Sequence, residues 1–158
     1  MSEKFTPEFT AGVQLMSALM GMTLAFKKRF GDEALKVAQG FTVQIGTQMG
    51  DRLKKKAGIT GTEIHDIERL YHAWLDPILA PHKLKTNVEG NKLTIARESP
   101  TMCPGLIVAK QMNLPLETVC NNISMRMFEG IAKSVNPNAK HSSVQMSEHK
   151  CIEMIKIP

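Results

Sequence analysis

Three cysteines, Cys103, Cys120 and Cys151, carry the most reactive side chains in this sequence. Cys103 directly precedes Pro104, and proline favours the first position of a helix because its missing N–H would have no partner there. We therefore expect Cys103 to cap a helix at the positive end of its dipole, where the pKa of a thiol tends to fall. The free N–H groups of such a helix end also bind carboxylates and oxyanions. Cys103 is thus the candidate nucleophile, and the alternative is a cysteine that only caps and packs.

Other side chains in the second half of the chain supply candidate partners for this thiol. His141, on the strand expected before the last one, is a candidate general base. Asn122 and Arg126 lie one helical turn apart, and arginine pairs well with a carboxylate, although a solvated helix face is the alternative for both. Cys120 and Cys151 are candidate substrate contacts, and each also fits an apolar stripe on which a free cysteine is buried and inert.

The cysteines match no familiar metal or disulfide pattern. Their spacings of 17 and 31 residues fit no compact zinc motif. An odd number of cysteines without a short-spaced pair argues against a disulfide framework and for a reducing, cytoplasmic compartment. The sequence contains no glycine-rich phosphate loop and no nucleophile elbow. We therefore expect neither a metal nor another cofactor.

The composition is that of an ordinary folded domain. The chain has 158 residues, of which 42% are hydrophobic and 22% charged, enough for one domain over residues 1–158 with a proper core. The formal charge of +5 comes from scattered residues, and the two basic runs, 27–29 and 54–56, fall where we place helix C-termini. The most apolar run, Ala11 to Phe26, is shorter than the ~20 residues of a membrane span. We expect neither nucleic acid nor a membrane as a partner.

The elements that must position these side chains begin with helices, over about residues 8–80. Residues 8–30 form two apolar stripes, which predicts a helix buried on most sides, either in the core or in the interface of a homo-oligomer. Gly31 ends this helix, and Asp32 is expected to cap the next one, which runs to about Lys56. The inner face predicted for the second helix holds five residues, Ala38, Phe41, Ile45, Met49 and Leu53.

Two glycines interrupt this second helix. Gly46 and Gly50 lie one turn apart, and each costs roughly 1 kcal/mol in a helix interior, so they need a packing reason, such as the close approach of another backbone. A third helix follows the possible capping box Thr60 to Glu63. Pro77 should kink or end that helix, and Pro81 must end it.

The period then changes to that of strands, over about residues 83–158. Residues 83–88 and 92–97 alternate around a turn, which predicts a hairpin, and 141–146 with 150–157 predict a second one. Between the hairpins lie two helices, one opened by Pro104 and one over 116–134. The order is ββααββ, which predicts an α+β fold with a four-stranded antiparallel sheet and helices on one face.

The chain resembles the L-2-amino-thiazoline-4-carboxylic acid hydrolase family over roughly residues 30–158. The resemblance is carried by five features in order: the 31–35 stretch that opens a long helix, Cys103-Pro104 after a hairpin, the helix with Cys120, Asn136-Pro137, and the final strand from Cys151. It implies a small cytoplasmic α+β domain that opens a thiazoline ring in an amino-acid-like substrate. The acidic residue usual in the family three positions after the second cysteine is Ile123 here.

Two functions therefore stand side by side. The first is a hydrolase of a small N,S-heterocyclic carboxylate, with Cys103 as nucleophile or activator and His141 moving protons. The second is a non-enzymatic sensor or carrier that holds a small molecule, similar to vinyl-reductase-type ligand-binding domains. The 11 methionines favour the second function because methionine packs adaptably around irregular shapes.

Overall fold

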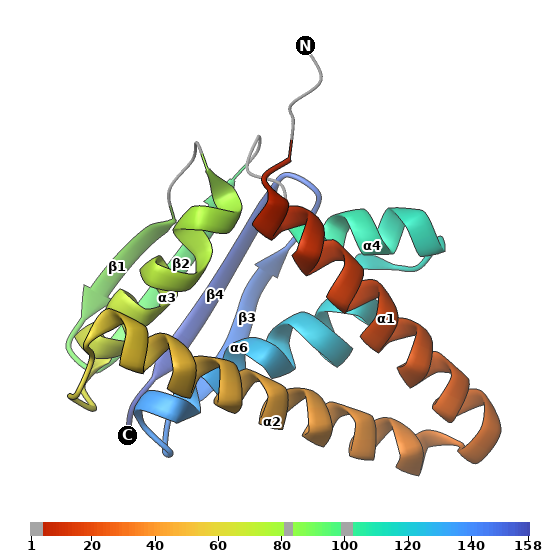
Figure 1. The fold of residues 1–158 in the computed structure, drawn as a ribbon, viewed down its shortest axis with the longest axis horizontal. Helices are drawn as coiled ribbons and strands as arrows, with labels where there is room; N and C mark the ends of the chain where they lie inside the picture. The colour runs from red at the N-terminus through yellow and green to blue at the C-terminus, as the bar shows by residue number, and fades with distance from the viewer. Residues whose placement is uncertain (1–4, 81–83, 99–102) are drawn as a thin grey trace.

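The structure, a computed structural model, describes residues 5–80, 84–98 and 103–158. Its α+β class and its ββααββ order confirm the fold predicted from the sequence (Figure 1). The expectations attached to residues 1–4, 81–83 and 101–102 lie outside the described residues. The elements in chain order are α1 (Pro7–Phe30), α2 (Asp32–Ala57), α3 (Ile64–Leu79), β1 (Lys85–Glu89), β2 (Lys92–Glu98), α4 (Pro104–Met112), α5 (Leu116–Val119), the π-helical turn η1 (Cys120–Ser124), α6 (Met125–Val135), β3 (Lys140–Met146) and β4 (Lys150–Lys156).

The sheet joins the two hairpins edge to edge. Its strand order is β1-β2-β4-β3, and every neighbouring pair is antiparallel, so β2 and β4 lie in the centre. In both central strands every second side chain is buried, as the period of a strand with one covered face requires. Arg97 of β2 lies opposite Cys151 of β4, and both belong to this buried face. The covered face therefore carries polar side chains as well as apolar ones.

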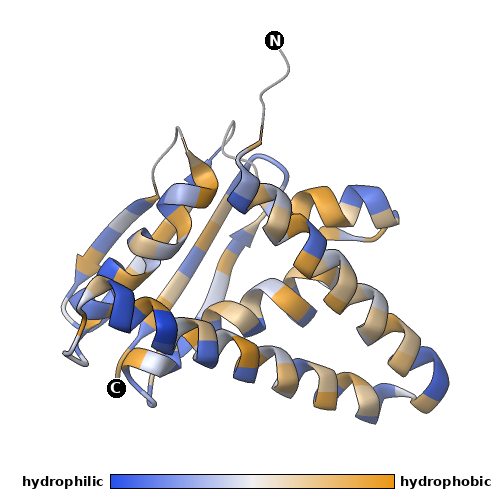
Figure 2. Ribbon diagram, in the orientation of Figure 1, coloured by the Kyte–Doolittle hydropathy of each residue, from blue (hydrophilic) through white to orange (hydrophobic). Residues whose placement is uncertain are grey.

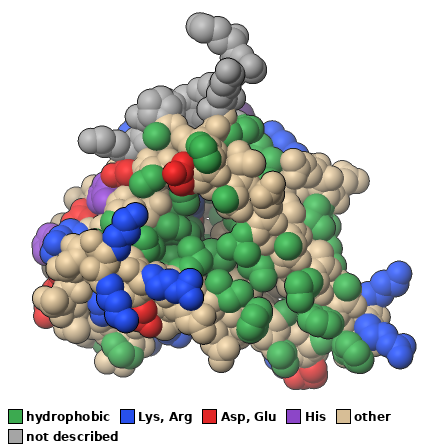
Figure 3. Space-filling view, in the orientation of Figure 1, with side chains coloured by type: hydrophobic (Ala, Val, Ile, Leu, Met, Phe, Trp, Pro, Cys, Tyr) green, Lys and Arg blue, Asp and Glu red, His purple; other side chains and the backbone are tan. Residues whose placement is uncertain are grey.

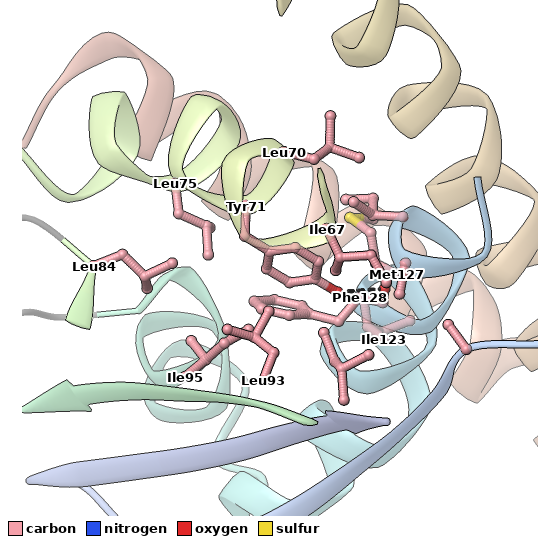
Figure 4. Close-up of a cluster of buried hydrophobic side chains, with 14 of the residues drawn as sticks. Ile67, Leu70, Tyr71, Leu75, Leu84, Leu93, Ile95, Ile123, Met127 and Phe128 are labelled. Carbon is pink, nitrogen blue, oxygen red and sulfur yellow. Dashed lines mark hydrogen bonds between the residues drawn. The ribbon is translucent and has the colours of Figure 1, made fainter. Parts of the chain in front are cut away.

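The helices pack against that face and enclose the core. Tyr71 of α3 is fully buried, and its hydroxyl donates a hydrogen bond of 2.6 Å to the backbone carbonyl of Phe128 on α6. Figure 4 shows Tyr71 and Phe128 between the sheet residues Leu93 and Ile95 and the other side chains of α3. The core thus forms where α3, α6 and the central strands meet.

Helices α2 and α6 approach each other closely through glycines. A side-chain carbon added at Gly46 would overlap the carbonyl oxygen of Met127, and one added at Gly130 would overlap that of Val43. The close approach expected at Gly46 and Gly50 is confirmed. The predicted inner face of α2 is wrong at Phe41, which is exposed, because the tight contact selects small residues; the buried ones are Thr42, Gly46 and Gly50.

Two helix starts also differ from the sequence-based expectation. Gly31 caps α2, and Asp32 is its first helical residue, where it pairs with Lys27 at 3.2 Å. The capping box of α3 lies three residues later than predicted, because Glu63 is the cap and Asp66 bonds back to its N–H. Proline at position 77 is accommodated inside α3.

The long helix predicted over 116–134 contains a π-helical turn. The backbone N–H of Met125 donates to the carbonyl of Cys120, five residues earlier, and η1 separates α5 from α6. A π turn adds one residue and shifts the face that the following side chains present, and such turns are frequent at functional sites. Here the turn ends at Ser124, which lines the cavity described next.

Candidate functional site

An apolar cavity of about 320 Å³ lies where α1, α3, α4 and α6 meet beside the sheet. Figure 3 shows that the molecule is hollowed between these helices on the face that α1, α2 and α3 form. Most of the lining is aliphatic or aromatic, including Met16, Trp74, Ile78 and Phe128. The polar groups in the lining are few: Glu8, Arg97, Cys103 and Ser124.

Arg97 is the buried cation of this site, and its side chain is only 8% exposed. Its Nη2 donates a hydrogen bond to Glu153 Oε1 on the adjacent strand. The guanidinium carbon lies 4.9 Å from the centroid of the Phe128 ring, a cation–π arrangement. Among the described residues, Arg97 Nε is buried without a hydrogen-bond partner. Arginine therefore retains an unused N–H donor beside an apolar cavity.

The ring of His141 packs against the ring of Phe128, with the two centroids 5.5 Å apart. Nδ1 is 3.2 Å from the carbonyl oxygen of Met125, and Nε2 is 3.2 Å from Glu153 Oε2. Both of these oxygens accept hydrogen bonds, whereas a neutral imidazole has a single N–H to donate. Both ring nitrogens thus lie next to oxygen atoms and not next to a thiol, and a neutral ring donates to only one of the two oxygens.

The three predicted cysteines converge around Arg97. Cys103 caps α4, as expected, and lines the cavity. Cys151 lies opposite Arg97, and its thiol donates to the carbonyl of Ser147 at 3.8 Å. Burial raises the pKa of Cys120 to about 12, and the neighbouring Cys103 and Cys151 act in the same direction. Cys120 is therefore a neutral thiol at physiological pH.

The two remaining predicted binding residues lie elsewhere. Asn122 donates to the carbonyl of Thr118 at 2.7 Å and accepts from Gln39 of α2 at 2.9 Å. Arg126 is partly exposed and pairs with Glu129 at 3.0 Å. These contacts hold η1 and α6 in place, and neither side chain belongs to the described lining of the cavity.

Sequence reasoning missed the ion pair between Arg97 and Glu153. A signal for it existed, because Arg97 follows Leu93 and Ile95 on one strand face, while Glu153 lies between Cys151 and Ile155 on another. A charge on the inward face of each central strand indicates a buried pair, since an unpaired buried charge is very costly. The sequence analysis did not predict that β2 pairs with β4, and this pairing brings the two charges together.

Within the described ranges 5–80, 84–98 and 103–158, no group of three or more His, Cys, Asp or Glu side chains is arranged to hold a metal ion. Comparison with protein-family models, with curated proteins and with solved structures found no match for this chain. The resemblance to the thiazoline-carboxylate hydrolases therefore stays a prediction from the sequence.

Burial of His141 makes the stability of the protein depend on pH. Burial lowers its pKa from 6.5 to about 4, so between these values the unfolded chain binds a proton that the folded protein does not. Stability should therefore fall as the pH is lowered from about 6.5 towards 4, by at most about 3 kcal/mol in total. Urea unfolding of the wild type and of His141→Gln across this pH range measures this loss of stability.

The variant should show a flatter pH dependence than the wild type, whatever its absolute stability. His149→Gln is the matched control, because His149 is an exposed histidine in the turn of the same hairpin, and it should keep the wild-type slope. Equal slopes for the wild type and His141→Gln would show that His141 is protonated to the same extent in the folded and unfolded states.

Proposed function

We propose that this protein binds a small molecule that has an apolar body and a hydrogen-bond-accepting or anionic head. The observation that carries this proposal is an apolar cavity of about 320 Å³ whose lining includes buried Arg97, the Nε of which has no hydrogen-bond partner among the described residues. The volume is within the range of small-molecule sites, which are mostly apolar with a few polar groups that fix orientation. The apolar lining favours a hydrophobic body, and the arginine favours an oxygen acceptor at one end.

The polar end of the cavity explains the preferred head group. A buried N–H without a partner leaves a desolvation cost of about 1–3 kcal/mol, which an acceptor on the ligand would remove. The Glu153 carboxylate compensates the charge of Arg97 but leaves Nε free. Hydrogen bonds with a charged partner are the stronger ones, so a carboxylate should bind more tightly than a hydroxyl on the same chain.

Hydrolysis of a small heterocyclic carboxylate is the second candidate, favoured by Cys103, which lines the cavity at the N-terminus of α4. The binding function is favoured over it because both ring nitrogens of His141, the candidate general base, lie next to oxygens of Met125 and Glu153 and not next to a thiol. Water-dependent opening of a thiazoline carboxylate breaks a ring C–S bond and yields a new thiol. Appearance of that thiol with the wild type, and its loss in Cys103→Ser, would decide for the hydrolase.

Binding is tested by calorimetric titration with decanoate and 1-decanol, two ten-carbon probes that differ in the head group. Ala11 is exposed at the edge of the cavity lining, so Ala11→Trp should fill the cavity and weaken binding at least tenfold, about 1.4 kcal/mol. Ala18→Trp is the matched control, because Ala18 is exposed on the same helix and is not among the described lining residues.

We expect decanoate to bind the wild type and Ala18→Trp equally, and more tightly than decanol. A decanoate affinity that Ala11→Trp leaves unchanged would place the binding outside this cavity and contradict the proposal. Failure of both probes to bind the wild type would also contradict it.

A further inference from the structure

Helices α1 and α2 form an arm that extends beyond the sheet and exposes large apolar side chains. The two helices meet at Gly31, far from the strands (Figure 1). Figure 2 shows hydrophobic residues along both helices of this arm. Phe30 is 66% exposed and Val37 is 74% exposed, while Met22, Phe26 and Phe41 are also exposed. Two apolar stripes were expected to bury α1 on most sides, and the second consists of Leu15, Leu19, Met22, Phe26 and Phe30. All of this second stripe except Leu19 is exposed.

The exposed side chains border a groove between the two helices. The groove has a volume of about 480 Å³ and is lined from both sides. Leu19, Met22 and Phe26 contribute from α1, while Val37 and Phe41 contribute from α2. Exposed apolar side chains that gather in one contiguous patch mark interaction sites, whereas isolated exposed apolar residues are common and carry no such meaning.

We infer that a second copy of this chain docks on the arm, so that the two arms pack against each other across a two-fold axis. A two-fold interface uses the same patch on both copies, and the patch must therefore be complementary to itself. This arm presents a groove whose own lining includes two exposed phenylalanines, Phe30 and Phe41. Across the two-fold axis, the exposed apolar side chains of one copy would pack against those of the other.

The area available is close to the minimum for a specific dimer. If a fully exposed large apolar side chain contributes about 150–200 Å², the exposed fractions on this face amount to roughly 500 Å² per copy. The two copies together would bury about 1,000 Å², the smallest total area expected of a biological interface. The side chains included are those of Met22, Phe26, Phe30, Val37 and Phe41.

A membrane is the alternative partner of this arm, because α1 is an apolar helix. By length and composition α1 is able to cross a bilayer, although core helices of soluble proteins meet the same criteria. Its other face is packed in the fold, where Phe9, Met16 and Met20 are buried. At the tip of the arm, Asp32 and Glu33 pair with Lys27 and Lys36, and Lys28 and Arg29 add two further positive charges. Spanning a bilayer would expose the packed face of α1 to lipid, whereas docking of a second copy leaves that face in place.

Sedimentation equilibrium tests the inference directly. We expect the wild type to have twice the mass of the 17.5 kDa chain, and the double variant Phe30→Glu/Phe41→Glu to have the mass of one chain. The two-fold axis brings each glutamate into the apolar patch of the other copy, which should weaken association at least 100-fold, about 2.7 kcal/mol. Val144→Glu is the matched control, because Val144 is an exposed apolar residue on β3, away from the arm. The Val144→Glu variant should stay dimeric.

Circular dichroism verifies that the variants are folded, and Val37→Glu replaces the double variant if that one is not. A wild type that stays monomeric at about 0.1 mM, where a micromolar dimer would be assembled, would overturn the inference. Dimerisation that persists in both the folded double variant and Val37→Glu would overturn it too. Cosedimentation of a monomeric wild type with anionic phospholipid vesicles would assign the arm to a membrane instead.

Discussion

Glu153→Ala is expected to lower the free energy of unfolding by about 3–5 kcal/mol. Glu153 is buried and is the partner of both the Arg97 guanidinium and the His141 ring. Its removal leaves the charge of Arg97 buried and uncompensated, and that desolvation cost exceeds the value of most single contacts. Urea unfolding at pH 7 measures the loss.

Two further variants separate the buried charge from the lost contacts. The double variant Arg97→Met/Glu153→Met removes both charges and should recover most of the stability, since apolar replacements of a buried pair are often neutral. Glu148→Ala breaks an exposed ion pair with Lys110 and should cost at most about 1 kcal/mol. A cost for Glu153→Ala no greater than that of Glu148→Ala would show that water reaches Arg97 in the folded protein.

Gly46→Ala is expected to destabilise the fold by about 3 kcal/mol, at the upper end of the usual range for overpacking. The added carbon would overlap the carbonyl oxygen of Met127, which is backbone and has little freedom to move. Helices α2 and α6 would have to separate, and the hydrogen bond from Thr47 to the carbonyl of Gly130, 3.2 Å long, would be stretched. Thermal and urea unfolding both report this loss.

Gly40→Ala is the matched control on the same helix. An added carbon at Gly40 meets nothing within 4 Å, so the substitution should stabilise the protein by up to about 1 kcal/mol through helix propensity alone. The changes in the free energy of unfolding expected for Gly46→Ala and Gly40→Ala therefore have opposite signs. Stabilisation by Gly46→Ala as well would mean that α2 and α6 are separated enough in solution to admit a methyl group.

Local chemistry made most of the fold predictable. The apolar period of α1, the strand alternation around Gly90, and the Pro104 start of α4 each depend on residues close in sequence. The errors in the predicted fold arose where contacts between residues far apart in the sequence determined which side chains are buried. Phe41 was expected to face inward by its hydrophobicity, but the α6 backbone lies so close to α2 that only small residues fit there.

The candidate site was predictable only in part. Sequence alone identified Cys103 as a helix cap and placed Cys120 and Cys151 on inward faces, and the structure brings all three close to Arg97. It also assigned binding roles to Asn122, which instead bonds Gln39 of α2. Whether a polar side chain on a helix meets solvent, a ligand or another helix depends on which elements pack beside it.

By itself, the sequence determined the order of helices and strands, the two hairpins, and the position of a thiol at the start of α4, because periodicity, turns and caps act over a few residues. Only the tertiary structure decided that Arg97 and Glu153 form a buried pair beside an apolar cavity and that most of the second apolar stripe of α1 stays exposed. The pairing of β2 with β4 and the packing of α2 on α6 join residues far apart in the chain. The Cys103-Pro104 helix start and Arg97 both line that cavity, and the Nε of Arg97 is buried without a hydrogen-bond partner among the described residues.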